Sequence, residues 1–477
     1  MRHPRSGDVG GARACIAAFL LLALPVSLWF ALKTPLGDVA DEPAHLMRAA
    51  ALLDGQIVGH RETVRLPDGR AFVAAGVTVD PVWKAMSRSR DPADVSRPAD
   101  PPPDPALGSG PWDATRRFEA LYTIGTYFPA FYAPGALGLA AGRLTGASPR
   151  EAAILGRLAA TLAYAGLAVA ALALARRGRL LLLATLALPM SLSLGGSFNH
   201  DGLIIAAACL AAALLSRSWD DAPGAPRRPA SWLAAALIAL IVLAKPPYAP
   251  LAVLLLPPLR RPGLPLRASL MALAVLPGVL WAGFTVAHVA TPVPRAAYEA
   301  GPLWPGPRPA VFAATDPQAQ FQVLAAAPAR IATLPAGYLF TLKHALWLGR
   351  TGIGLLGWLD RPLPTPLYPL WALGLVGALL AGGRARDGGW VERGGLLLLA
   401  ALACLWGILL SQYLTWTHVG EPRIDGPQGR YLLPLMPLML PLLASGGAGA
   451  PWRRAAGWLP ILAAGAGLAL VPALMRL

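Results

Sequence analysis

The dominant pattern in the chain is a series of long apolar runs separated by short polar segments. A membrane-spanning helix needs about 20 apolar residues. The pattern predicts an all-α integral membrane protein with about eleven transmembrane helices, or roughly 10 to 13 where proline interrupts a run. The predicted spans lie near residues 14–32, 152–175, 180–196, 201–216, 231–245, 247–259, 268–290, 365–381, 395–416, 430–446 and 455–475.

The basic residues of the short loops predict the orientation of these helices. Arginine and lysine in short loops favour the cytoplasmic side of a membrane. With a cytoplasmic N-terminus, the basic groups that flank alternate spans all fall on that side. These groups are Arg2, Arg5 and Arg13, then Arg176, Arg177 and Arg179, Arg217, Arg227 and Arg228, Arg260, Arg261 and Arg267, Arg384, Arg386 and Arg393, and finally Arg453 and Arg454.

This orientation leaves two long segments on the outer side, residues 33–151 and 291–364. The apolar stretch 127–142 cannot be a full span without inverting every later loop, so it is predicted to be an interfacial or half-inserted helix. The stretch 331–358 is predicted to behave in the same way. In the middle of the first of these segments, residues 91–105 are rich in proline and aspartate, which is typical of irregular chain.

The domain organisation follows from these runs. A single transmembrane domain is predicted over residues 1–446, and residues 447–477 add a C-terminal transmembrane helix. The first apolar run could be a secretory signal peptide, but it lacks a small-residue cleavage site, which favours an uncleaved anchor.

Composition narrows the class of protein. Of 477 residues, 55% are hydrophobic and 14% charged, against roughly 25% charged in soluble domains, so a soluble enzyme and a disordered protein are excluded. The net charge of +16 is scattered between apolar runs and indicates topology, with no nucleic-acid partner. Cys15, Cys209 and Cys404 lie in separate apolar runs, without the spacing of a metal site or a disulfide framework.

The most informative polar motif, Asp41-Glu42-Pro43-Ala44-His45-Leu46-Met47-Arg48, directly follows the first span. It predicts a helix with Asp41 as its N-cap and Gly55 near its end. On this helix Asp41, His45, Arg48 and Leu52 share one face. The opposite face, expected to pack on the membrane-side core, consists of Leu46, Ala49, Ala50 and Leu53. The simpler alternative is a capped interfacial helix with a His–Asp pair on its solvated side.

Further polar groups fall on the same predicted outer side, each with a structural alternative such as a membrane belt of aromatic residues or a helix cap. Ionisable groups beside spans are costly and are usually paired or functional. The clustering therefore predicts one outward-facing site. Its other members are Tyr127 and Tyr132 in the stretch Tyr127–Pro134, Arg157, Asp201 in Ser197–Gly202, Lys245 and Tyr248 in Lys245–Tyr248, and Arg430 in Gly426–Tyr431.

Such a site suits the transfer of a sugar from a lipid phosphate. A carboxylate can deprotonate an acceptor hydroxyl that attacks the sugar, and Arg157, Lys245 and Arg430 could hold the phosphate that leaves. No cofactor is required by the sequence. A divalent metal, Mg or Mn, could bind at Asp41, His45, His200 or Asp201, although no spacing demands one, and no metal ligand is assigned.

The motifs resemble the GT-C glycosyltransferase superfamily and, more closely, the bacterial domain-of-unknown-function family 2142. The similarity covers residues 30–445 and includes, besides the motifs above, Gly357-Trp358-Leu359-Asp360. The resemblance implies a GT-C-like fold with juxtamembrane helices in a long first extracytoplasmic loop. It also implies inverting transfer, with Asp41 as general base and Glu42 as an orienting or second carboxylate.

The expected setting is the bacterial plasma (inner) membrane, with the active site extracytoplasmic. The expected partners are the lipid bilayer, a polyprenyl-phosphate sugar donor and a cell-envelope glycan, lipid or protein acceptor. His45, Arg48, Tyr127, Tyr132, Arg157, Asp201, Lys245, Tyr248 and Arg430 are expected to bind substrate. A polysaccharide polymerase or ligase that uses a lipid-linked glycan, and a lipid-linked sugar transporter or flippase, are the alternatives.

Overall fold

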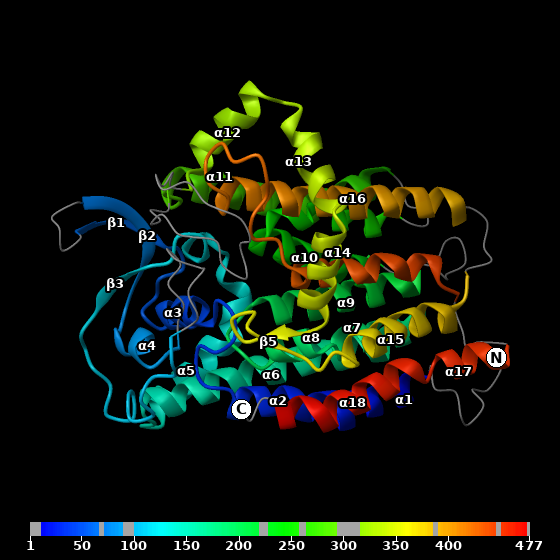
Figure 1. Ribbon diagram of the computed structural model, residues 1–477, viewed down its shortest axis with the longest axis horizontal. Coiled ribbons are helices and arrows are strands. Elements are labelled where there is room, and N and C mark those ends of the chain that lie inside the picture. The colour runs from blue at the N-terminus through cyan, green and yellow to red at the C-terminus, as the bar shows by residue number, and fades with distance from the viewer. Residues whose placement is uncertain are drawn as a thin grey trace.

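The computed structural model describes residues 11–65, 71–88, 100–218, 228–256, 264–292, 315–384, 390–444 and 450–474. It is 69% helical. Most long helices run side by side along the horizontal axis of Figure 1, and a small β-sheet lies at one end of them. This arrangement is that of a mostly helical membrane protein.

Within the described residues, five helices are long and apolar enough to cross a membrane, by length and composition. They are Ala12–Lys33, Pro149–Leu174, Pro265–His288, Arg393–Thr415 and Pro451–Ala473. The corresponding elements are α1 (Ala12–Ala18), η1 (Phe19–Ala23) and α2 (Leu24–Lys33), then α6 (Pro149–Leu174), α11 (Leu264–His288), α16 (Trp390–Thr415), and α17 (Pro451–Ala456) with α18 (Leu459–Leu474).

The other predicted spans are also helical, but their helices are shorter or interrupted, so the predicted number of eleven is not established. Pro189, for example, separates two short helices. These elements are α7 (Arg179–Leu186), α8 (Pro189–Gly195), α9 (Asp201–Ser218), α10 (Arg228–Ala244), η4 (Pro246–Leu255), α15 (Leu367–Gly382) and η5 (Gly429–Leu442).

Prolines interrupt the hydrogen bonding of η5, a 3₁₀-helix. Each N–H of a 3₁₀-helix bonds to the carbonyl three residues earlier, and proline has no N–H to donate. Pro434 therefore leaves the carbonyl of Tyr431 without a partner inside the helix. The Tyr248 hydroxyl, from η4, donates to that carbonyl at 2.8 Å, so the two 3₁₀-helices are joined where each begins.

The two stretches predicted to lie at the interface do not form span-length helices. The first contains η3 (Pro129–Tyr132) and α5 (Ala133–Leu144); the 12 residues of α5 extend only about 18 Å. The second is divided into α13 (Arg330–Leu339) and α14 (Leu342–Ile353), and α12 (Pro317–Ala326) precedes it. Both stretches therefore remain compatible with the predicted interfacial placement.

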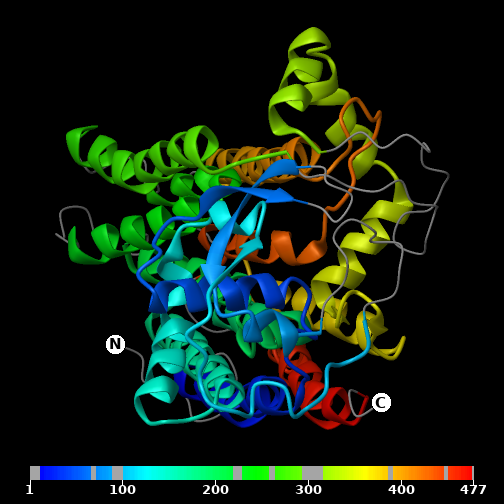
Figure 2. The same cartoon turned by 90° about the vertical axis from the view of Figure 1, so that its left-hand side faces the viewer.

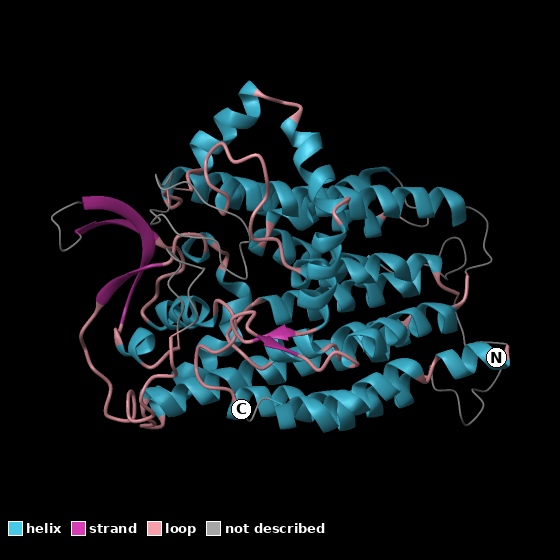
Figure 3. Ribbon diagram, viewed as in Figure 1, coloured by secondary structure: helices cyan, strands magenta, loops and turns pink. Residues whose placement is uncertain are grey.

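The prediction of an exclusively α-helical chain missed a small sheet in the first outer segment. Its strands are β1 (His60–Arg65), β2 (Ala71–Val79) and β3 (Arg117–Ala120), in the antiparallel order β1-β2-β3. His60 pairs with Gly76, and Val79 with Arg117. A second hairpin joins β4 (Leu355–Leu356) to β5 (Arg361–Pro362). Figure 3 shows the larger sheet in magenta, beyond the helix ends.

The sheet and the short helices packed against it form a compact cap at this end of the molecule, which we call the outer cap because the sequence predicts it on the outer side. Against the sheet pack α3 (Glu42–Leu53) and η2 (Ile124–Thr126), and α4 (Val82–Ala85) packs against α3; Figure 2 views this end of the molecule. Leu46, Val77, Trp83 and Leu139 form a hydrophobic cluster of their own within it. The segment 33–151, predicted to lie on the outer side, is therefore ordered over its described residues. Residues 91–99 of the predicted irregular stretch lie outside them, and 100–105 contain no helix or strand.

Candidate functional site

The acidic motif begins on a strained residue. Asp41 occupies the N-cap position of α3 as predicted, but its backbone is left-handed, with φ of 65°, and its side chain makes no cap hydrogen bond. Aspartate is among the few residues that tolerate this conformation. The predicted capping role is therefore wrong. The carboxylate instead pairs with Arg430, and the side chain remains 40% exposed.

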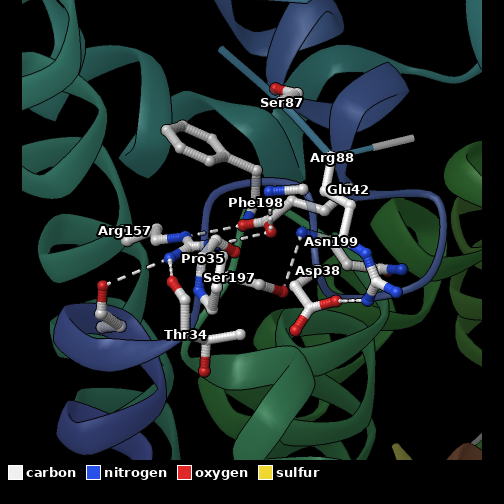
Figure 4. A network of polar contacts seen from close by, with 12 residues as sticks. Thr34, Pro35, Asp38, Glu42, Ser87, Arg88, Arg157, Ser197, Phe198 and Asn199 are labelled. Carbon is white, nitrogen blue, oxygen red and sulfur yellow. Dashed lines mark hydrogen bonds and ion pairs between the residues drawn. The ribbon is translucent and has the colours of Figure 1, made fainter. Parts of the chain in front are cut away.

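Glu42, the next residue, points into the protein. Its carboxylate receives two bonds from Arg157, at 2.8 Å from Nε and 2.5 Å from Nη2. The backbone N–H groups of Gly37 and Phe198 also donate to it, at 3.0 and 3.2 Å. Figure 4 shows these contacts between the loop after α2, the turn before α9 and α6. Glu42 is fully buried, with a donor on each side.

Arg157 has no guanidinium nitrogen left over. Besides the carboxylate, its Nη1 donates to the carbonyl of Thr34 at 2.6 Å, and its Nη2 to that of Pro35 at 3.0 Å. These carbonyls directly follow α2, where the helix leaves them without intrahelical partners. Arg157 therefore ties the end of the first span to the acidic motif, which argues against its predicted use as a phosphate ligand.

A second ionic group forms from four of the residues expected in one site. Arg430, at the start of η5, contacts Asp41 through Nη2, and its Nε lies 3.7 Å from Asp201. Lys245, between α10 and η4, lies 2.5 Å from the other oxygen of Asp201. The four residues come from the starts or ends of four different helices and alternate in sign. We call Asp41, Arg430, Asp201 and Lys245 the ionic cluster.

Tyrosine rings border the ionic cluster. The Lys245 ammonium lies 4.7 Å from the centre of the Tyr431 ring and 6.0 Å from that of Tyr127, both within cation–π range. Tyr431 also stacks below the Arg430 guanidinium, at 5.3 Å. Tyr127 thus lies where it was predicted, whereas the contribution of Tyr431 was not recognised, although it ends the quoted motif Gly426–Tyr431. Tyr248 does not contact the cluster cations directly in this way; its hydroxyl donates to the Tyr431 carbonyl.

A stack of four rings, three of them buried and that of Tyr127 partly exposed, lies beside the cluster. His45 Nδ1 is 2.7 Å from the Tyr132 hydroxyl, and the His200 ring lies 4.9 to 5.1 Å from those of His45, Tyr127 and Tyr132. Burial lowers the pKa of His45 to about 4, against the attraction of Asp41 and Asp201. Burial likewise lowers the pKa of His200 and raises those of both tyrosines. These groups are therefore neutral at pH 7.

Helix α3 is more deeply buried than predicted. Both His45 and Arg48, expected on an open or solvated face, are almost completely buried, as is Leu46 on the opposite face. The Arg48 guanidinium donates to the carbonyls of Gln56, Ile57 and Tyr127. Arg48 therefore anchors the chain after α3. The alternative of a solvated interfacial helix is wrong, because His45 and Arg48 on this face are buried.

A buried ion-pair network near Asp41 was missed by the sequence analysis. Asp38 is fully buried and pairs with Arg88 and, at 2.9 Å, with Arg361. Burial raises its pKa, although both arginines oppose this shift. The Trp358 indole donates to the carbonyl of Gly37 at 2.9 Å. The motif Gly357–Asp360 thus braces the acidic loop, a role that no pattern in the sequence indicated.

The described side chains do not fit a divalent metal. No group of three or more His, Cys, Asp and Glu residues in the described ranges is placed to hold one. Both carboxylates of the ionic cluster already face cations. We therefore assign no step to a metal.

Comparison with known proteins gives one match. A family model described as a predicted membrane protein, DUF2142, matches residues 24–439, a range that contains all members of the ionic cluster. No curated protein and no solved structure matches the chain.

Proposed function

The chain belongs to the DUF2142 family of predicted membrane proteins, and we propose that it transfers a sugar from a polyprenyl-phosphate donor to a cell-envelope acceptor. The observation that carries this proposal is the difference in exposure among the acids beside α3. Asp38, Glu42 and Asp201 are buried and paired. Asp41 alone among these four is 40% exposed, so an acceptor can reach it.

In the proposed reaction, Asp41 accepts a proton while one bond to the sugar forms and another breaks. The acceptor hydroxyl gives its proton to the Asp41 carboxylate as its oxygen attacks C1 of the sugar. The bond between C1 and the phosphate oxygen breaks, and its electron pair leaves with the polyprenyl phosphate. A new glycosidic bond forms with inversion, and the proton then passes from Asp41 to the phosphate or to water.

The cations of the cluster would stabilise the leaving group. Arg430 and Lys245 come from separate helices and converge on Asp201, which holds them in place before the phosphate arrives. Donors fixed in advance around developing negative charge lower the barrier most effectively. Tyr127 and Tyr431, both partly exposed, would contact the sugar. His45, Arg48, Tyr132, Tyr248, Glu42 and Arg157 are assigned positioning roles.

The distribution of charge along the helices supports an outward-facing site. The ionic cluster lies where α9 and η5 begin, whereas arginines lie where α9 and η5 end. Arg177 donates to the carbonyls of Pro441 and Leu443, and Arg217 lies in the last turn of α9. We propose that the arginine end is cytoplasmic. The site would then face outward from a bacterial plasma membrane, in a GT-C-like fold of about eleven spans.

The same placement favours transfer over transport. A transporter needs its binding site near the middle of the membrane, reachable in turn from both sides. The ionic cluster instead lies at helix ends, at the starts of α3, α9 and η5 and at the end of α10. Uptake or flipping by the purified protein without covalent transfer would contradict the proposal.

The test uses the full-length protein in nanodiscs. Lipid extracts from a deletion strain would first identify the donor as the polyprenyl-phosphate sugar that accumulates. With that donor radiolabelled, Asp41→Asn should lower transfer by roughly 10²–10⁴-fold, the usual contribution of a general base. Asp54→Asn is the matched control, because Asp54 follows α3 and pairs with Arg116 away from the cluster. Full transfer by Asp41→Asn would exclude it as the base.

A further inference from the structure

Arg430 contacts the two acids of the ionic cluster unequally. Its Nη2 bonds to Asp41, whereas its Nε lies 3.7 Å from Asp201 and has no hydrogen-bond partner among the described residues. The side chain is only 3% exposed. A buried guanidinium with an unused donor is a strong ligand for an anion, because burial makes an unpaired donor costly.

Asp41 is the more replaceable of the two acids. Asp201 is held by a second cation, since Lys245 lies 2.5 Å from its Oδ1. Asp41 pairs with Arg430 as its one ion-pair partner within the described part of the chain. Its backbone carbonyl accepts from the N–H groups of Ala44 and His45, at 3.1 and 3.2 Å. The carboxylate can therefore rotate away while the main chain stays fixed.

We propose that Arg430 restrains Asp41 and that the donor phosphate, on binding Arg430, displaces the carboxylate and so frees the base. This inference rests on the proposed function, because it assigns an order to the steps at the same site. Phosphate oxygens match the fork of donors on a guanidinium, and such charge-assisted bonds are the strongest of their kind. A phosphate can also engage Nε, which the Asp41 contact leaves unused.

The exchange would make Asp41 reactive only when a donor is present. Two acids and two cations balance one another in the cluster. A phosphodiester that binds Arg430 brings one negative charge and leaves Asp41 without its cation on the exposed side of the site. A carboxylate released from a guanidinium is a better proton acceptor. Donor binding should therefore precede deprotonation of the acceptor.

This competition predicts a gain in affinity when the charge of Asp41 is removed. We would measure binding of farnesyl phosphate, a short polyprenyl phosphate, to the full-length protein in nanodiscs. Asp41→Asn should bind it roughly tenfold more tightly than wild type, equivalent to about 1.4 kcal/mol. Asp41→Glu restores the competing charge and should bind as wild type does. Asp54→Asn removes a carboxylate outside the cluster and should leave the affinity unchanged.

The outcomes separate this inference from the proposed function. Unchanged or weaker binding by Asp41→Asn would overturn the exchange, and so would equal tightening by Asp41→Glu, because charge would then not be the cause. Transfer is measured on the same preparations. Loss of transfer without tighter binding would leave the proposed function standing and the exchange refuted. Tighter binding with full transfer would leave the exchange standing and exclude Asp41 as the base.

Discussion

Two carboxylates that are neighbours in the sequence belong to opposite kinds of environment. Glu42 is fully buried, and Arg157 and two backbone N–H groups surround it. Asp41 is 40% exposed and pairs with Arg430 through one oxygen. In a helix, successive side chains diverge by about 100°, and the left-handed backbone of Asp41 turns its side chain away further. The backbone conformation at Asp41 and the start of α3 thus gives Glu42 a structural role and leaves Asp41 accessible.

The two ion pairs should differ in their contribution to the free energy of unfolding. Removing one partner of a buried ion pair leaves an uncompensated charge and typically costs about 3–5 kcal/mol. A partly exposed pair is compensated by water and is worth about 1 kcal/mol or less. The Glu42–Arg157 pair should therefore dominate stability, and the Asp41–Arg430 pair should dominate activity.

The largest expected effect is on the buried pair. Arg157→Ala should lower the free energy of unfolding by about 3–5 kcal/mol, because the buried Glu42 carboxylate loses its cation and the carbonyls of Thr34 and Pro35 lose the Arg157 donor. Denaturant titration of the detergent-solubilised protein measures this loss. Arg116→Ala is the matched control, since Arg116 forms a bidentate but exposed pair with Asp54. A loss no larger than that of the control would show that the buried pair does not organise the acidic loop.

The buried histidine one turn after Asp41 gives a smaller effect that depends on pH. The pKa of His45 is lowered from 6.5 to about 4, so between these values the unfolded chain binds a proton that the folded chain does not. Stability is thus complete above pH 6.5 and declines as the pH falls toward 4. The expected loss is on the order of 3 kcal/mol.

Thermal unfolding measured from pH 7.5 down to pH 4.5 tests this dependence. His45→Gln removes the titrating ring and can still bond to the Tyr132 hydroxyl, so its unfolding temperature should vary less with pH. An equally steep dependence in the variant would assign the loss to other groups.

The ionic cluster could be predicted from the sequence because its members follow or precede apolar runs. Helices that cross in alternate directions bring such ends to the same side, so Asp41, Asp201, Lys245 and Arg430 could be grouped by position alone. The pairing within that side could not. Glu42 and Arg157 are 115 residues apart, and which cation faces which acid depends on lateral packing, which the apolar pattern does not specify.

The sheet and the 3₁₀-helices could not be predicted from the hydropathy pattern of the sequence. In β2, Ala74, Ala75 and Val77 are all buried, because the outer cap covers both faces of the strand, so the alternation that signals a half-buried strand is lost. In η5, the spacing of Pro434 and Pro437 matches a repeat of three, yet apolar content alone predicts an ordinary span. Hydropathy carries no information about local hydrogen bonding, so neither β2 nor η5 could be predicted from it.

The smallest expected effect on stability is at Asp41 itself. Asp41→Asn keeps the size of the side chain, and asparagine also tolerates a positive φ. Its side chain caps nothing and is 40% exposed, and Arg430 keeps Asp201 as a second acid beside it, so the free energy of unfolding should change by less than about 1 kcal/mol, while transfer is lost. The same denaturant titration that detects the Arg157→Ala loss measures this difference. A loss near that of Arg157→Ala would mean that both acids are structural, and the division between neighbouring carboxylates would fail.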